Sequence, residues 1–271
     1  MQDPRLYGII GHPLGHSLSP PLHNWALSAQ ALPGAYMRWD IAPEQLGVFI
    51  QAARLLPVHG ASVTIPHKTA IIGHLDRIHV RARQAGAVNT LYWEDEELCG
   101  TNTDIDGFLA PLRALPRFPH SALVLGNGGA ARACVAGLLE HGVQVWICGR
   151  NQDKSEALAA AFGAQTLPWE QRTTTSAELL VNATPLGMAG ERAHISPLDD
   201  GLGLERFGTI YELIYNPQDT ALLRQARELG IPSISGLAMF VHQAAAQFRL
   251  WTGAEMDTSG AWQLCTRALQ T

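Results

Sequence analysis

An apolar run, a cluster of glycines and a helical pattern follow one another in residues 121–142, and they constrain the fold of this chain most strongly. Residues 121–126 predict a strand, residues 126–142 predict a glycine-rich turn and a helix, and residues 143–149 predict the next strand. The turn from Gly126 to Ala131 satisfies G-x-G-x-x-G/A in the strand–turn–helix context of a dinucleotide-binding unit. A purely structural turn is the alternative, and the context favours the dinucleotide.

The same alternation of strands and helices extends to both sides of this unit. Strand-like runs lie at residues 6–10, 35–40, 60–65 and 87–93, and residues 178–188 and 208–217 each predict a strand that runs into a loop. Helical patterns lie at residues 19–32, 43–56, 104–115 and 152–163. This order predicts βαβ units with mainly parallel sheets. Two prolines within residues 113–121 mark a break between two such series, so we place a domain join just before them.

The composition excludes several classes of protein. Hydrophobic residues make up 46% and charged residues 16% of the 271 residues, which is typical of a globular chain. A net charge of −5 without a basic run argues against nucleic-acid binding. We also expect no signal peptide, since the first residues show no positively charged start followed by an apolar stretch. We expect no membrane span, since no stretch approaches a length of roughly 18 uninterrupted apolar residues. The four cysteines form no C-x-x-C pair, which favours free thiols in a reducing cytoplasm over a disulfide framework or a zinc site.

Lysine is rare in this chain, with only Lys68 and Lys154 among the 19 Lys and Arg residues. A lysine side chain can release a proton when its surroundings favour the neutral form, whereas arginine cannot. Lys68 is therefore a candidate for proton transfer, and a solvated loop lysine is the alternative. Asp104, at the start of a predicted helix, is either an N-cap or the carboxylate partner of Lys68.

The end of the second strand of the dinucleotide unit carries cations. Gly149 is followed by Arg150, and Lys154 lies four residues further on. An NAD site usually places an acid here, so two cations favour the 2′-phosphate of NADP. A solvated helix start is the alternative.

Two serines precede the helical pattern at residues 19–32. Ser17 and Ser19 lie two residues apart, so their hydroxyls can face the same ligand, although N-capping alone would explain Ser19. His12 and His16 lie four apart in the same glycine- and proline-rich loop. Further metal ligands are not identified, so we expect no metal.

Nine motifs in chain order make this sequence resemble the shikimate dehydrogenase family. They are HSLSP (16–20), SVTIPHK (62–68), GAVNT (86–90), GTNTDIDG (100–107), GNGGAARA (126–133), GRNQDK (149–154), NATPLGM (182–188), ELIYNPQDTALL (212–223) and SGLAMFVHQAA (235–245). The departures from the family pattern are Ser62 for Asn, Asn127 for Ala, Gly149 for Asn, Asn151 for Thr and Glu212 for Asp.

The resemblance implies two α/β domains with a cleft between them. The first would be an N-terminal substrate-binding domain of residues 1–104 with 238–271, and the second a Rossmann-like NADP-binding domain of residues 105–237. The implied reaction, a step of chorismate and aromatic amino acid biosynthesis, is the reversible NADPH-dependent reduction of 3-dehydroshikimate to shikimate, with Lys68 and Asp104 as the proton-transfer pair. The implied substrate-binding residues are Ser17, Ser19, Thr64, Asn89, Tyr215 and Gln243. The implied NADP-binding residues are Gly126, Asn127, Gly128, Gly129, Ala130, Arg150, Lys154, Thr184, Leu213 and Gly236.

Two other interpretations stay open. One is a relative that uses quinate or NAD, although relatives that accept quinate often carry Thr or Gly at the position of Ser19. The other is a dinucleotide sensor without enzymatic activity, against which the intact Lys68 and Asp104 count. In each case we expect a cytoplasmic monomer or homodimer whose partner is a small molecule rather than nucleic acid or membrane.

Overall fold

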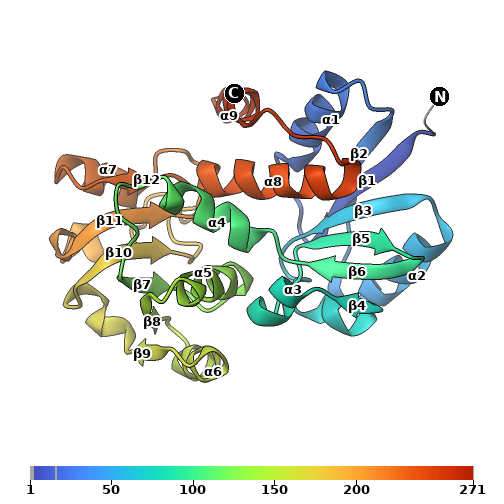
Figure 1. Cartoon of the computed structure of the whole chain (residues 1–271). Helices are drawn as coiled ribbons and strands as arrows, with labels where there is room; N and C mark the ends of the chain where they lie inside the picture. The colour runs from blue at the N-terminus through green and yellow to red at the C-terminus, as the bar shows by residue number, and fades with distance from the viewer. Residues whose placement is uncertain (1–2, 16, 271) are drawn as a thin grey trace. The chain divides into compact units, whose positions relative to one another are not determined.

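The computed structural model describes residues 3–15 and 17–270 and divides the chain into two units. Unit 1 comprises Met1–Thr103 with Val241–Thr271, and unit 2 comprises Asp104–Phe240. These joins lie one and three residues from the predicted ones, which were 104/105 and 237/238. Each unit contains one six-stranded sheet (Figure 1).

The sheet of unit 1 has the strand order β2-β1-β3-β5-β6-β4. Its strands are β1 (Arg5–Gly11), β2 (Gly34–Asp40), β3 (Val58–Val63), β4 (Arg77–Ile78), β5 (Thr90–Glu94) and β6 (Glu97–Thr101). The helices α1 (Ser19–Ala29) and α2 (Leu46–Leu55) return the chain between β1, β2 and β3, so these three strands are parallel. β5 is antiparallel to both of its neighbours, β3 and β6. Asp95 and Glu96, both with positive φ, form the two-residue hairpin turn between β5 and β6.

The sheet of unit 2 has the order β12-β11-β10-β7-β8-β9, and all its strand pairs are parallel. Its strands are β7 (Ser121–Leu125), β8 (Gln144–Cys148), β9 (Gln165–Leu167), β10 (Ala177–Asn182), β11 (Phe207–Glu212) and β12 (Ser233–Ile234). Its helices are α4 (Asp104–Arg113), α5 (Gly129–Glu140), α6 (Gln152–Phe162) and α7 (Ala221–Glu228). Ala122 to Leu125 in β7 are fully buried, as expected for a central parallel strand covered on both faces.

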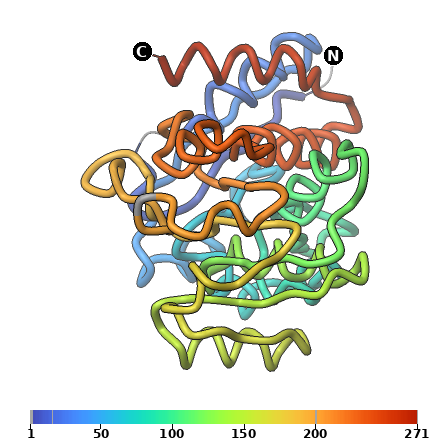
Figure 2. Tube along the Cα trace, turned by 90° about the vertical axis from the view of Figure 1, so that its left-hand side faces the viewer, coloured from blue at the N-terminus to red at the C-terminus, as the bar shows by residue number. Residues whose placement is uncertain are grey.

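The C-terminal residues belong to unit 1. α8 (Gly236–Thr252) begins in unit 2, and its later residues and α9 (Thr258–Ala268) pack with the first hundred residues. α9 lies beside α1, as the red and blue helices at the top of both views show (Figure 1, Figure 2). The Trp251 ring nitrogen donates to the Leu91 carbonyl oxygen at 2.9 Å. Gly60 permits this approach, since a Cβ atom there would lie 2.3 Å from the indole.

Several local predictions differ from the structure. Ser19 is the first residue of α1 rather than its N-cap, which is Leu18. The helix predicted at residues 43–56 is divided into a 3₁₀ turn at Pro43–Gln45 and α2. The expectation of mainly parallel sheets holds for unit 2 and for the β2-β1-β3 part of unit 1, whereas β5 departs from it. Within the described part of the chain, no helix has the length and apolar character needed to cross a bilayer.

Candidate active site

The carboxyl ends of β1 and β3 form a topological switch point in unit 1. From β1 the chain continues to β2 on one side, and from β3 it continues to the strands on the other side. Ligands of open α/β sheets bind outside the strand ends at such points. Ser17 and Ser19 follow β1, and Thr64 and Lys68 follow β3. The two loops touch, since the His12 backbone N–H donates to the Ile65 carbonyl oxygen at 3.0 Å.

Two hydrogen bonds within unit 1 connect the segment of Lys68 with Thr103 by way of residues 88–89. The Val88 N–H donates to the Lys68 carbonyl oxygen at 2.7 Å. The next residue, Asn89, accepts a hydrogen bond from the Thr103 N–H on its side-chain oxygen, also at 2.7 Å. Asp104 directly follows Thr103 and is the first residue of α4. Lys68 and Asp104 belong to different units, so the pairing of their side chains stays a prediction.

A buried polar network connects side chains of β2, β3, α8 and the start of β5 in unit 1. The Tyr36 hydroxyl donates to Ser62 Oγ at 2.6 Å, and Ser62 Oγ donates to Gln247 Oε1 at 2.7 Å. Gln247 Nε2 donates to the Thr90 hydroxyl at 2.9 Å, and Thr90 donates to the Asn89 side-chain oxygen at 2.7 Å. All five residues are buried, so each polar atom depends on these partners rather than on water.

Burial sets the protonation of two rings at the end of this network. Burial raises the pKa of Tyr36, and hydrogen bonds with the Ser62 and Ser19 side chains reverse only part of this rise. The phenol therefore keeps its proton and remains a hydrogen-bond donor. The His23 ring stacks on Tyr36 with centroids 4.4 Å apart. Burial lowers the pKa of His23 to about 3, so this ring is neutral at physiological pH. The buried network thus reaches Ser19 without adding a charge.

The glycine turn of unit 2 lies at a second topological switch point, between β7 and β10. Gly126 has φ of +114°, and a Cβ atom there would lie 2.8 Å from the Ala183 carbonyl oxygen, so only glycine fits. The turn therefore lies against Thr184, which follows Ala183. Gly128 is the N-cap of α5, and beyond the adjoining backbone no described atom lies within 4 Å of the position that a Cβ atom would take there. Open space beside the amino end of a helix fits a pyrophosphate.

The end of β8 carries the two predicted cations. Arg150 and Lys154 are exposed, and neither forms an ion pair with another described residue. Asn151 between them is the N-cap of α6 and accepts a hydrogen bond from the Lys154 backbone N–H at 2.9 Å. Two unneutralised cations beside a helix start fit a phosphate group.

The other predicted residues of unit 2 lie after β11. A Cβ atom on Gly236 would lie 2.2 Å from the Leu213 carbonyl oxygen, so these two residues are in backbone contact. The Tyr215 ring lies 4.7 Å from the Phe240 ring, measured between centroids. Gln243 lies on the part of α8 that belongs to unit 1 and is half-buried.

A buried carboxyl group, to which no motif assigns a role, connects the loops of unit 2. Glu212, fully buried at the end of β11, accepts hydrogen bonds from Asn182 Nδ2 at 2.9 Å, the Ile214 N–H at 3.0 Å and the Thr220 hydroxyl at 3.0 Å. Asn182 Oδ1 in turn accepts from the Thr184 hydroxyl at 2.7 Å. Burial raises the pKa of Glu212 to about 7, and these hydrogen bonds limit the shift.

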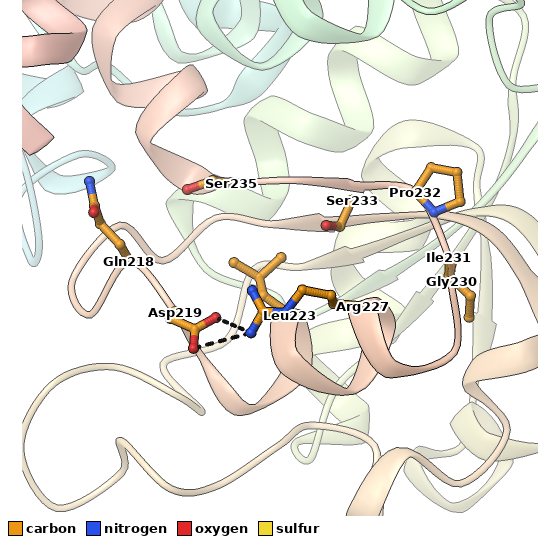
Figure 3. A pocket seen from close by; sticks show the side chains of 9 residues that line it. All are labelled: Gln218, Asp219, Leu223, Arg227, Gly230, Ile231, Pro232, Ser233 and Ser235. Atoms are coloured by element: carbon orange, nitrogen blue, oxygen red, sulfur yellow. Dashed lines mark hydrogen bonds and ion pairs between the residues drawn. The ribbon is translucent and has the colours of Figure 1, made fainter.

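A pocket of about 400 Å³ lies between α7 and β12 (Figure 3). Its carboxylate, Asp219, pairs with Arg227 at 3.1 Å and with Arg224 at 3.5 Å. The predicted site residues do not line it, and its only carboxylate is already paired, so we assign it no part in the site.

The fold and these residues define a two-domain α/β oxidoreductase that uses a dinucleotide. Residues 9–91 match the shikimate dehydrogenase substrate binding domain, and residues 236–264 match the shikimate 5′-dehydrogenase C-terminal domain. Residues 122–196 match the coenzyme F420-dependent NADP oxidoreductase family. The chain belongs to the shikimate dehydrogenase family, since a relative of that name matches it over nearly its whole length.

That relative is the shikimate dehydrogenase (NADP(+)) of Oleidesulfovibrio alaskensis, which is 49% identical over 98% of this chain and 96% of its own length. The crystal structure of shikimate 5-dehydrogenase from Thermus thermophilus with NADP(H) and shikimate matches with a TM-score of 0.89 and 40% identity, over 98% of this chain and all of that chain. The 5-ketofructose reductase of a Gluconobacter species matches with a TM-score of 0.86 and 28% identity, over 98% of this chain and 99% of its own. The family and the two-domain α/β fold predicted from the sequence are confirmed.

We predict that Ser62 and Tyr36 act as a coupled pair in stability. Ser62→Ala removes both the acceptor of Tyr36 and the donor to Gln247, so the free energy of unfolding should fall by about 1–3 kcal/mol. Tyr36→Phe should also destabilise the chain, and the double variant should lose less than the sum of the two. Urea unfolding of the four proteins measures this coupling, and strictly additive losses would contradict it.

We predict a pH-dependent stability difference between the native chain and Glu212→Gln. In the unfolded chain Glu212 loses its proton near its ordinary value of 4.5, whereas the folded chain keeps the proton until about pH 7. A raised folded pKa means that the native chain loses stability relative to the variant as the pH rises from 4.5 to 7, with little further change above 7. Urea unfolding across this range measures the difference, with Glu228→Gln, an exposed carboxyl on α7, as control. If the free energies of unfolding of the native chain and of Glu212→Gln change in parallel with pH, the pKa of Glu212 is not raised by folding and the prediction is wrong.

Proposed function

We propose that this chain reversibly reduces the keto group of 3-dehydroshikimate to give shikimate, with NADPH as cofactor. Its family and its similarity to a relative whose structure holds NADP(H) and shikimate support this proposal. Within the chain, the strongest support is the edge at which β1 and β3 end side by side. There the loop that carries Ser17 and Ser19 (the serine loop) lies next to the loop that carries Thr64 and Lys68 (the lysine loop). Hydroxyl donors for a carboxylate beside a proton donor suit a hydroxylated acid.

The substrate residues divide into two groups by their hydrogen-bonding capacity. Ser17 and Ser19 donate hydrogen bonds to the substrate carboxylate. Thr64, Asn89, Tyr215 and Gln243 bind the ring hydroxyls. Thr64, Tyr215 and Gln243 can both donate and accept, whereas Asn89 donates through its Nδ2, because its side-chain oxygen already accepts from Thr90 and Thr103.

Proton transfer is assigned to Lys68. Reduction of a ketone adds a hydride to the carbon, which comes from NADPH when it is bound, and a proton to the oxygen. The Lys68 ammonium donates that proton to the carbonyl oxygen, and in the reverse direction the Lys68 amine accepts it from the hydroxyl. Asp104 supplies the opposite charge that orients the ammonium group.

We assign the cofactor to residues of unit 2, and the geometry of its glycine turn supports this assignment. Gly126, Asn127, Gly128, Gly129 and Ala130 form the turn against which the pyrophosphate lies. Arg150 and Lys154 bind the 2′-phosphate. Thr184, Leu213 and Gly236 line the rest of the site.

The setting of the enzyme is a further part of the proposal. For its oligomeric state we infer a monomer or homodimer, as the resemblance to the family implies. The four cysteines are free and buried, which suits a reducing cytoplasm.

The direct test of this function is the reduction of NADP⁺ with shikimate as substrate, followed by the absorbance of NADPH. We expect turnover with shikimate and NADP⁺, and a much lower kcat/KM with quinate or with NAD⁺. Faster turnover with quinate or NAD⁺ would favour the alternative interpretation, in which the chain is a relative that uses quinate or NAD. Binding of NADP⁺ without turnover of either acid would contradict the proposed reaction.

We predict that Lys68→Arg lowers kcat by about 10²–10⁴-fold, the range that general acid–base catalysis supplies, because arginine cannot release its proton. The KM for shikimate should change little, since the positive charge is kept. The same substitution at the other lysine, Lys154→Arg, should lower kcat far less, because only charge is needed there. Steady-state kinetics measure both, and a near-native kcat for Lys68→Arg would refute the assignment of Lys68.

A further inference from the structure

Two departures from the family pattern meet at the end of β8. Asn127 stands where the pattern has Ala, and Gly149 stands where it has Asn. The Asn127 Nδ2 atom donates to the Asn151 carbonyl oxygen at 3.1 Å and to the Ser155 hydroxyl at 3.2 Å. A backbone carbonyl oxygen can only accept, so the amide is oriented with its nitrogen toward α6.

Gly149 leaves the room that the Asn127 side chain occupies. A Cβ atom at position 149 would lie 2.7 Å from Asn127 Nδ2 and 2.8 Å from Ser155 Oγ. Such distances are too short for real contacts, so a larger residue at 149 would displace the Asn127 amide. In the family pattern, the Asn at position 149 provides a side-chain amide at the end of β8. In this chain, Asn127 of the glycine turn provides that amide instead.

The Asn127 amide completes a group of hydrogen bonds at the start of α6. Asn151 caps this helix through its side chain, and its carbonyl oxygen accepts from the Ser155 N–H at 3.2 Å and from the Ser155 hydroxyl at 3.1 Å. Asn127 is a third donor to this carbonyl oxygen, and it comes from a different loop. The glycine turn is thereby connected to the helix start that carries Arg150 and Lys154.

We propose that Asn127 is a positioning residue that fixes the glycine turn relative to Arg150 and Lys154, and thereby sets the preference for a 2′-phosphorylated dinucleotide. This inference rests on the proposed function. A dinucleotide contacts both places at once, since its pyrophosphate lies at the glycine turn and its adenosine ribose at the end of the second strand. A preset spacing therefore lowers the entropic cost of binding.

Asn127→Ala removes the connection and keeps both cations. The Kd of NADP⁺, measured by calorimetry, should rise about 3- to 10-fold, which is the range that one neutral hydrogen bond supplies. The Kd of NAD⁺ should rise less, because NAD⁺ has no phosphate for the cations. The KM for NADP⁺ should rise while kcat stays within about twofold. Gln152→Ala, one residue into α6, is the matched control and should leave both Kd values unchanged.

Rescue by a second substitution separates this role from general destabilisation. Gly149→Asn alone should lower the urea midpoint of the cofactor-free chain and weaken NADP⁺ binding, because the new side chain meets Asn127. Asn127→Ala combined with Gly149→Asn should recover most of the urea midpoint, since the alanine vacates the space and the Ser155 hydroxyl can rotate away. Its NADP⁺ Kd should be no higher than that of Asn127→Ala alone, because the connection through Asn127 is lost only once. Additive losses in the double variant, or an unchanged NADP⁺ Kd in Asn127→Ala, would overturn the inference.

The same measurements distinguish this inference from the proposed function. A native chain that binds NADP⁺ tightly but does not oxidise shikimate would contradict the proposed function alone. The NADP⁺ affinities of the variants at positions 127 and 149 would then still test the role of Asn127. A native chain that oxidises shikimate but binds NAD⁺ as tightly as NADP⁺ would overturn the inference alone.

Discussion

The direction in which the chain leaves its parallel strands determines where chemistry can take place in each unit. At β1/β3 in unit 1 and at β7/β10 in unit 2, the connections diverge to opposite sides, so the ends of these strands are not covered by a crossing loop. Side chains that follow these strands are therefore available to a ligand, and backbone N–H groups at the start of α5 are available as well. The serine loop, the lysine loop and the glycine turn each occupy one of these positions.

Each unit supports its strand-end loops with buried polar groups, although such groups are costly to bury. Ser62 and Gln247 in unit 1, and Glu212 and Asn182 in unit 2, have hydrogen-bond partners that are themselves buried. Removing a single member leaves another polar atom without a partner, which costs more than the hydrogen bond itself contributes. Such networks therefore restrict each loop to one arrangement, which suits a site that must orient its substrate.

Local patterns in the sequence were sufficient to predict much of the fold and the position of the glycine turn. The turn from Gly126 is recognisable because a strand, a short run of glycines and a helix are contiguous in the sequence. The contact of Ser62 with Gln247 was not predictable, because 185 residues separate the two and only tertiary packing joins them. One signal was available, since Gln247 lies four residues after Gln243 and therefore near the same face of α8. Strands of two residues, such as β4 and β12, are too short to show a periodic pattern.

The central claim is that Lys68 exchanges a proton with the oxygen at which the ketone is reduced. A crystal structure of the chain with shikimate and NADP⁺ bound tests this claim most directly. We expect Lys68 Nζ to lie within about 2.6–3.2 Å of the reacting hydroxyl oxygen, the distance that direct proton transfer requires. A lysine nitrogen that is turned away from this oxygen and surrounded by bulk water would contradict the account.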